Sequence, residues 1–178
     1  TILIHGAGGG VGTAAIQLAQ AAGGNIIGTA SAWKHERLKE MGVNLCIDYG
    51  KENVYEKVME YTKNKGVELI IDPVGSNNWK ASYRCLAPLG KLVIFGDQNF
   101  VKGKKFSFLT SLKEFFSMPK YRPMDLMSKN RSIMGYHLGR LIGSEYRIHR
   151  AVEKLNELAK DGKIKPVIDK IFPFSEAP

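Results

Sequence analysis

Short apolar runs alternate with amphipathic stretches along most of the chain, which is typical of βαβ units around a parallel sheet. Six apolar runs predict strands, at residues 2–5, 25–29, 45–48, 67–72, 91–95 and 132–137. Periodic stretches predict helices at residues 11–22, 32–41, 52–65, 77–86, 109–117, 123–129 and 145–160. The pattern predicts an α/β protein, a Rossmann-type doubly wound sheet of six parallel strands.

Both ends of the chain have the features of a domain within a longer protein. The first residues already form a predicted core strand, and an apolar run at residues 164–171, broken by Pro166, is strand-like. Ser175 is suited to cap a following helix. We therefore expect residues 1–162 to form the Rossmann domain and residues 163–178 to begin a segment that returns to a second domain.

The composition matches one ordinary globular domain, with 178 residues, 44% of them hydrophobic, and a mean hydropathy of −0.18. No window approaches the roughly twenty apolar residues of a membrane span, so we expect no transmembrane segment. The cysteines, Cys46 and Cys85, are too few for a disulfide framework and lack the spacing of metal ligands. They indicate buried thiols in the reducing cytoplasm, and no metal site is predicted.

The net charge of +9 is concentrated in one segment. Residues 101–131 contain eight lysines and arginines and two acidic residues, so this segment carries six of the nine charges. It could bind nucleic acid or an anionic membrane, or it could be a solvated excursion around a cofactor site. No nucleic-acid-binding motif accompanies the charge, so the second interpretation is favoured and nucleic acid is not expected as a partner.

The first predicted strand runs directly into a glycine-rich turn and then into an alanine-rich helix. Residues Ala7-x-Gly9-x-x-Gly12 match the dinucleotide-binding fingerprint, with alanine in place of the first glycine. The fingerprint needs a tight turn, a backbone without a side chain beneath the pyrophosphate, and a small residue where the helix meets the sheet. The first amides of the helix, near Gly10 and Val11, would then face the phosphates.

Two other classes of nucleotide site also place glycines after a first strand. A phosphate-loop NTPase is disfavoured because Thr13 and Ala14 follow Gly12, where that motif requires lysine and then serine or threonine. A methyltransferase that uses S-adenosylmethionine is the stronger alternative. That class normally offers a carboxylate at the end of the second strand, which this sequence lacks.

The end of the second predicted strand indicates which dinucleotide binds. It consists of the uncharged residues Thr29, Ala30 and Ser31, and Lys34 follows shortly after. An acidic residue here would bind the 2′-hydroxyl of NAD and repel the 2′-phosphate of NADP. A hydroxyl and an ammonium group suit the phosphate, although helix-capping serines and surface lysines are also common. The local chemistry therefore favours NADPH as the cofactor.

Several further motifs follow the fingerprint and the segment at residues 29–36. They are Ile47-Asp48-Tyr49, Asp72-Pro73-x-Gly75, Leu86-x-Pro88-x-Gly90-Lys91, Gly135-Tyr136-His137-Leu138-Gly139 and Ile164-Lys165-Pro166-x-Ile168-Asp169. Together these motifs resemble the zinc-independent quinone oxidoreductase branch of the medium-chain dehydrogenase/reductase superfamily, most closely its vesicle amine transport protein-like members. The resemblance spans nearly the whole chain. It implies that residues 1–162 are the NADP-binding domain and that most of the substrate domain lies outside this chain.

The resemblance also implies an activity, the transfer of hydride from NADPH to a quinone or an α,β-unsaturated carbonyl as small-molecule electron acceptor. It implies a homodimer for the full-length protein and an inactive isolated domain. The implied cofactor contacts are Ala7, Gly9, Gly10 and Val11 in the glycine turn, Ser31, Lys34 and Tyr49 around the 2′-phosphate, and Pro73, Gly75, Phe95, Gly96, Tyr136, His137 and Leu138 at later strand ends. Asp97 departs in part from the family pattern, which often has a small or uncharged residue there.

No Ser/His/Asp or Cys/His constellation is evident in the sequence, so no catalytic residue is assigned. His137 is the candidate polar group near the site, although a histidine at a strand end is more often a structural hydrogen-bonder. His5 is expected to be a packing or backbone-bonding residue.

A second hypothesis is a membrane-associated adaptor that keeps NADPH for structure and has little or no catalysis. Its peripheral membrane contact would be the basic segment at residues 101–131, whose phenylalanines and leucines would suit an interfacial anchor. The same side chains could instead line a substrate pocket or a dimer contact.

Overall fold

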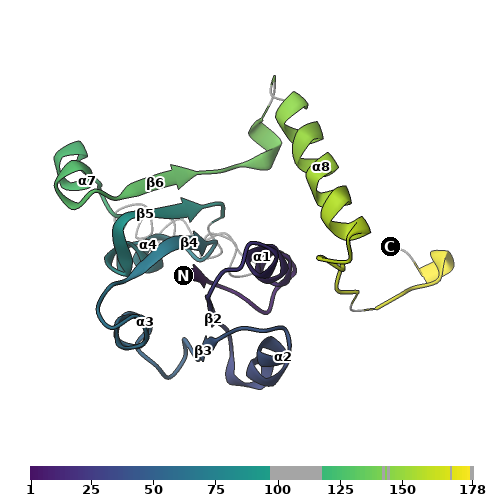
Figure 1. Cartoon of the computed structure of the whole chain (residues 1–178), viewed down its shortest axis with the longest axis horizontal. Helices are drawn as coiled ribbons and strands as arrows, with labels where there is room; N and C mark the ends of the chain where they lie inside the picture. Colours follow the sequence, from purple (N-terminus) through teal and green to yellow (C-terminus); the bar gives the residue numbers. More distant parts are fainter. Residues whose placement is uncertain (97–117, 142, 144, 169, 177–178) are drawn as a thin grey trace.

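Six parallel strands form one sheet, in the order β3-β2-β1-β4-β5-β6, in the computed structural model, which describes residues 1–96, 118–141, 143, 145–168 and 170–176. The strands are β1 (Ile2–Ile4), β2 (Ile26–Thr29), β3 (Leu45–Ile47), β4 (Val67–Asp72), β5 (Leu86–Ile94) and β6 (Ser132–Gly135) (Figure 1). The chain adds β2 and β3 on one side of β1 and then returns to add β4, β5 and β6 on the other. The predicted doubly wound sheet is confirmed, with its topological switch point between β1 and β4.

Helices connect the strands and cover both faces of the sheet (Figure 1). The helices before β6 are α1 (Gly10–Ala21), η1 (Ala32–Lys34), α2 (His35–Glu40), α3 (Val54–Tyr61), α4 (Ser76–Arg84) and α7 (Pro123–Lys129). After β6 come η2 (Leu138–Arg140), α8 (Glu145–Lys160) and η3 (Phe174–Glu176). Successive side chains of a strand point to opposite faces. Ile2 and Ile4 therefore share a core with α1 and α2, whereas Leu3 shares the other core with α3 and α4. The helix predicted at residues 109–117 lies outside the described residues.

The fifth strand begins five residues earlier than the sequence predicts. β5 starts at Leu86, which pairs with Val67 of β4 before the register shifts. Leu89, 84% exposed, then has a φ of 64°, and its N–H donates to the carbonyl oxygen of Asn130 at 2.6 Å. The proline and glycine on either side of Leu89 are typical of a turn. The prediction of a strand starting at residue 91 was wrong because pairing with β4 continues across this irregularity.

The strand-like run at residues 164–171 does not form a strand among the residues that the structure describes there. Pro166 has no N–H to donate, and the N–H of Lys165 donates to Oε1 of Gln17 at 2.5 Å. Without a neighbouring strand, apolar side chains of this segment are exposed, most completely Ile171 at 81%. Ser175 lies in the short helix η3, and the capping of a helix that would follow it stays a prediction.

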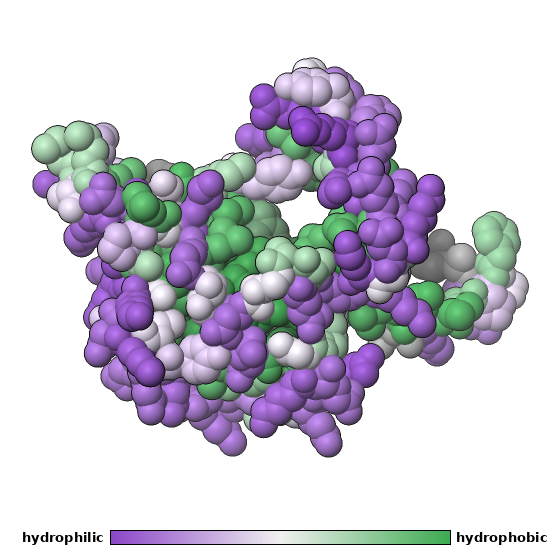
Figure 2. All heavy atoms as spheres, in the orientation of Figure 1, coloured by the Kyte–Doolittle hydropathy of each residue, from purple (hydrophilic) through white to green (hydrophobic). Residues whose placement is uncertain are grey.

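Helix α8 has the predicted bounds but does not bury its predicted apolar stripe, which consists of Ile148, Val152, Leu155 and Leu158. None of its residues is buried. A cavity of about 430 Å³ lies between α1 and the α8 residues Leu155, Asn156 and Ala159, and residues 164–167 also line it. Figure 2 shows this opening beside the body of the sheet, with hydrophobic side chains at its edge. The helical spacing predicted for the stripe is therefore correct. The surface that would pack against the stripe is not among the described residues.

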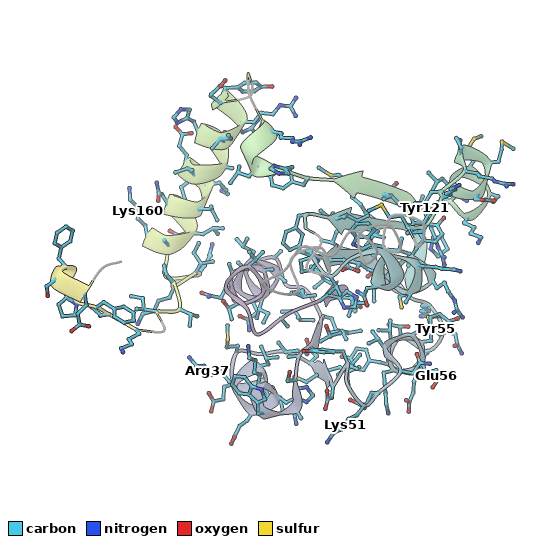
Figure 3. The ribbon with its side chains drawn as sticks, turned by 180° about the vertical axis from the view of Figure 1, so that it is seen from behind. Arg37, Lys51, Tyr55, Glu56, Tyr121 and Lys160 are labelled. Carbon is cyan, nitrogen blue, oxygen red and sulfur yellow. The ribbon has the colours of Figure 1, made fainter. Side chains whose placement is uncertain are left out.

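Helix α3 begins with a side-chain cap that gives a testable stability contribution. Oδ1 of Asn53 accepts from the N–H of Glu56, and Nδ2 of Asn53 donates to Oε1 of Glu56 at 2.9 Å. Glu56 lies on the exposed side of the helix (Figure 3). We expect Asn53→Ala to lower the free energy of unfolding by about 1 kcal/mol, because an orphan helix N–H loses its acceptor. Urea unfolding measures this change, and Asn53→Ser, which keeps an acceptor, is the control. Equal stability of the alanine variant and the wild type would contradict the expectation.

Candidate dinucleotide site

The glycine turn joins β1 to α1 at the carboxyl edge of the sheet. Ala7 is fully buried, and its N–H donates to the carbonyl oxygen of Thr29 at 3.0 Å. Gly9 is the N-cap of α1 and provides no side-chain cap. A Cβ added at Gly12 would lie 2.4 Å from the carbonyl oxygen of Gly6 and 2.5 Å from that of Ala7. Only glycine at position 12 allows α1 to pack this closely on the turn.

The first turn of α1 leaves donors and space for a ligand. An α-helix provides no intrahelical acceptor for its first amides, which here belong to Gly10, Val11 and Gly12. A Cβ added at Gly10 would meet no atom within 4 Å, and Val11 is 60% exposed. The positive end of the helix dipole also lies here. These features fit the pyrophosphate of a dinucleotide.

A pocket of about 160 Å³ opens beside this turn. Its lining comes from the glycine turn and from the ends of β1, β4 and β5: Ile4, His5, Gly6, Gly9, Gly10, Val11, Gly12, Ile71, Pro73 and Phe95. The pocket therefore sits at the switch point between β1 and β4, where doubly wound sheets bind their ligands. The structure brings together five of the predicted cofactor contacts here, namely Gly9, Gly10, Val11, Pro73 and Phe95.

The residues predicted around the 2′-phosphate follow β2 and β3. The hydroxyl oxygens of Ser31 and Tyr49 lie 3.2 Å apart and share one hydrogen bond. Nζ of Lys34 donates to the carbonyl oxygen of Gly8 at 3.1 Å, and the stem of this side chain lies over Gly8. An ammonium has three N–H donors, so two remain available. Ser31 and Tyr49 use one hydroxyl proton for their shared hydrogen bond, so the other also remains available to donate. Lys34 thus links this group of residues to the glycine turn.

The predicted contacts at later strand ends are only partly brought together. Gly75 is the N-cap of α4, with a φ of 132° that favours glycine. A Cβ added at Gly96 would lie 3.5 Å from the carbonyl oxygen of Pro73, so these two residues are neighbours. By contrast, Tyr136, His137 and Leu138 are exposed beyond β6 and do not line the 160 Å³ pocket.

A buried polar cluster beneath the turn was not predicted from the sequence. The ring nitrogens of His5 contact the hydroxyls of Thr29 at 3.1 Å and Ser82 at 3.0 Å, and the Ser82 hydroxyl donates to Oδ2 of Asp72 at 2.6 Å. Burial lowers the pKa of His5, and the Asp72 carboxylate opposes this change. His5 was expected to pack or to bond the backbone, and its actual partners are side chains. Ser82 is 77 positions away along the chain, so no local pattern could have revealed this contact.

Among the described residues, no three or more His, Cys, Asp or Glu side chains form a group that could hold a metal ion. Within the same part of the chain, no helix combines the length and the apolar character needed to cross a membrane.

The strand order and the glycine turn define a dinucleotide-binding domain of the Rossmann class. Comparison with known protein families identifies the family within this class to which the chain belongs. The family described as zinc-binding dehydrogenase matches residues 10–160. The chain belongs to this family, and therefore to the medium-chain dehydrogenase/reductase superfamily of oxidoreductases.

Individual relatives agree with this assignment. "Synaptic vesicle membrane protein VAT-1 homolog" of Rattus norvegicus is 36% identical over 177 residues, which cover 99% of this chain and 44% of that protein. The structure of Escherichia coli quinone oxidoreductase complexed with NADPH is 28% identical with a TM-score of 0.72, covering 94% of this chain and 47% of that one. The CurK enoyl reductase structure is 27% identical with a TM-score of 0.74, covering 98% and 48%. The chain spans less than half the length of each of these proteins.

These comparisons do not favour the adaptor hypothesis, because the matched family is described as a dehydrogenase and the two solved structures named above are reductases. Residues 101–117, which hold much of the proposed membrane contact, lie outside the described residues. In the described remainder of the basic segment, the Arg131 guanidinium donates to the carbonyl oxygen of Tyr83 at 3.0 Å. The Arg131 side chain therefore makes a contact within the domain itself.

Proposed function

We propose that this chain is the cofactor domain of an NADPH-dependent, zinc-independent oxidoreductase that reduces a quinone or an α,β-unsaturated carbonyl. The observation that carries the proposal is the glycine turn at the switch point, open at Gly10 and flanked by uncharged and basic residues. The similarity to a quinone oxidoreductase complexed with NADPH and to an enoyl reductase supports the same cofactor and both acceptor classes.

The proposal assigns the pyrophosphate to the first turn of α1. The amides of Gly10, Val11 and Gly12 would donate to it, and the helix dipole would add a favourable charge interaction. Gly9 and Gly10 present no side chain to this space, so the ligand can approach the backbone closely. Ala7 supports the turn from inside rather than touching the cofactor, since its side chain is fully buried.

The 2′-phosphate is assigned to the hydroxyls of Ser31 and Tyr49 and the ammonium of Lys34. No carboxylate follows β2 at the position that binds the 2′-hydroxyl in NAD-specific domains. A phosphate group here gains charge-assisted hydrogen bonds. NADPH, rather than NADH, is therefore the proposed cofactor.

The nicotinamide half is assigned to the residues that follow β4, β5 and β6. Pro73, Gly75, Phe95 and Gly96 form one group there, and Tyr136, His137 and Leu138 form a second, exposed group. NADPH supplies the hydride when it is bound. The chain positions the ring and shields one side of it from water.

The remaining parts of the proposal concern the whole protein. Residues 1–162 are assigned to the cofactor domain, and residues 163–178 to the start of a return to the substrate domain. The exposed apolar side chains of α8 and of residues 167–174 support this division, because a second domain would cover them. We also propose that the full-length protein is a homodimer. We further propose a cytoplasmic location, which the free thiols Cys46 and Cys85 support.

The experiment that tests the function measures loss of NADPH absorbance by the full-length protein with a panel of quinones and α,β-unsaturated carbonyls. We expect turnover on the order of 10 s⁻¹ with a preferred acceptor, and much slower turnover with NADH. This chain alone should bind NADPH without turnover, which serves as the control. A full-length protein that binds NADPH but reduces no acceptor in the panel would contradict the proposal.

A further inference from the structure

A continuous line of hydrogen bonds runs through the interior from β4 to the glycine turn. It begins at the Asp72 carboxylate, passes through Ser82, His5 and Thr29, and reaches the N–H of Gly6, which lies 3.4 Å from Oγ1 of Thr29. The four side chains come from β4, α4, the end of β1 and the end of β2, and all are at least 96% buried. The line therefore connects three strand ends that border the proposed cofactor site.

When the His5 ring is neutral, the chemistry of the partners fixes the direction of each hydrogen bond. The ionised carboxylate of Asp72 only accepts, so the Ser82 hydroxyl gives its single proton to Oδ2. Oγ of Ser82 must then accept from Nε2 of His5, and the other ring nitrogen, Nδ1, accepts from the Thr29 hydroxyl. This leaves Oγ1 of Thr29 as an acceptor for the N–H of Gly6. With a neutral His5 ring, one arrangement of protons satisfies every contact.

The surroundings of His5 favour this neutral ring. Burial lowers its pKa, and the single charged group facing it among the described residues of the cluster is Asp72, with Oδ2 3.9 Å from Nε2. Thr29 from β2 and Ser82 from α4 are uncharged. Tyr121, beside α4 (Figure 3), donates to the carbonyl oxygen of Trp79, and burial and Asp72 raise its pKa to about 12, so it is also neutral.

Asp72 is itself fixed by further donors. Oδ1 accepts from the N–H of Val74 at 2.8 Å, and Oδ2 also accepts from Nδ2 of Asn78 at 2.7 Å. The first of these bonds shapes the Pro73–Gly75 loop assigned to the nicotinamide half. At the other end of the line, Thr29 holds the glycine turn twice, through Oγ1 to Gly6 and through its carbonyl oxygen to Ala7. The line of hydrogen bonds thus contacts both the Pro73–Gly75 loop and the glycine turn.

We propose that His5, as a neutral Nε2–H imidazole, is a positioning residue that fixes the amide of Gly6 and the shape of the glycine turn before any dinucleotide binds. His5 acts through Thr29 and does not touch the cofactor. The consequence for affinity rests on the proposed function, because it assumes that this turn binds NADPH. The proton arrangement does not depend on that assumption.

Long-range proton–nitrogen NMR on the ¹⁵N-labelled chain tests the proton arrangement without any cofactor. We expect the His5 ring to show a protonated Nε2 and a bare Nδ1 across the pH range of about 5 to 8 in which an ordinary histidine titrates. Free imidazole added to the same sample serves as the internal control. A His5 ring that carries its proton on Nδ1, or that gains a second proton within this pH range, would overturn the proposal.

Thr29→Val tests the positioning role, because valine keeps the shape of threonine but removes the hydroxyl. We expect the amide resonance of Gly6 to shift and the Kd for NADPH to rise roughly tenfold. Thr29→Ser, which restores the hydroxyl, should recover most of the lost affinity. Val58→Ala, which removes buried side-chain volume from α3 but changes no member of the line, should lower stability without changing the Kd.

Two results separate this proposal from the proposed function. An unchanged Gly6 amide and an unchanged Kd in Thr29→Val would overturn the positioning role while NADPH binding stands. If the wild-type chain binds no NADPH, the proposed function fails, and the His5 tautomer and the Gly6 resonance still decide the positioning of the turn.

Discussion

Gly12→Ala is expected to lower the free energy of unfolding by about 3 kcal/mol, the upper end of the usual cost of overpacking. The added methyl would lie 2.4 Å and 2.5 Å from the carbonyl oxygens of Gly6 and Ala7. Both carbonyls belong to a turn whose Ala7 amide is tied to Thr29, so neither can move without breaking that link. Chemical denaturation measures the loss, and NADPH titration should show binding weakened beyond the measurable range.

Helix propensity alone predicts the opposite sign. Alanine is favoured over glycine inside a helix by about 1 kcal/mol, so an unconstrained position would gain stability. Gly10→Ala is the matched control, because the same methyl in the same helix meets no atom within 4 Å. We expect this control to keep full stability and still to weaken NADPH binding, since its methyl enters the space assigned to the pyrophosphate. A Gly12→Ala variant as stable as Gly10→Ala would contradict the close packing of α1 on the turn.

Ser31→Asp is expected to weaken NADPH binding about 100-fold, which corresponds to about 2.7 kcal/mol. A carboxylate would replace the hydroxyl that contacts Tyr49 and would face the 2′-phosphate. Two like charges about 4 Å apart near a protein surface repel by about 4 kcal/mol before screening by salt, which is enough for this loss. NADH, which lacks the phosphate, should bind as well as before or better. Competition between the two cofactors, followed by fluorescence, measures the change in preference.

Ser128→Asp controls for the added charge alone. Ser128 lies in α7, which precedes the amino end of β6 and so lies at the edge of the sheet opposite the site. This variant should bind NADPH like the wild type. Equal weakening of NADPH and NADH by Ser31→Asp would show that Ser31 supports the turn in general and does not face a 2′-phosphate.

The order of elements and the nucleotide turn were predictable because both depend on short stretches of sequence. The runs of apolar residues give the strands, and the fingerprint needs only Ala7, Gly9 and Gly12 with a strand before and a helix after. The bounds of β4, α7 and α8 match the prediction residue for residue. Ser31 and Lys34 were also found from local chemistry, whereas Tyr49 came from the family resemblance.

The features that were missed depend on partners far along the chain. The early start of β5 depends on Val67 and on the Asn130 carbonyl, neither of which is near Leu86 in sequence. The His5 line needs residues from four elements, and nothing around His5 alone indicates it. Residues 164–171 have the composition of a strand, but a strand also needs a neighbour that can hydrogen-bond to it, and the described residues provide none.

The central claim is that the glycine turn between β1 and α1 binds NADPH, and direct titration of this chain with NADPH and with NADH tests it. The exposed Trp33, next to Lys34, provides a fluorescence signal, and calorimetry gives an independent Kd. The account predicts saturable binding of one NADPH per chain, at least about tenfold tighter than NADH. Tighter binding of NADH, or no binding of either dinucleotide, would contradict it.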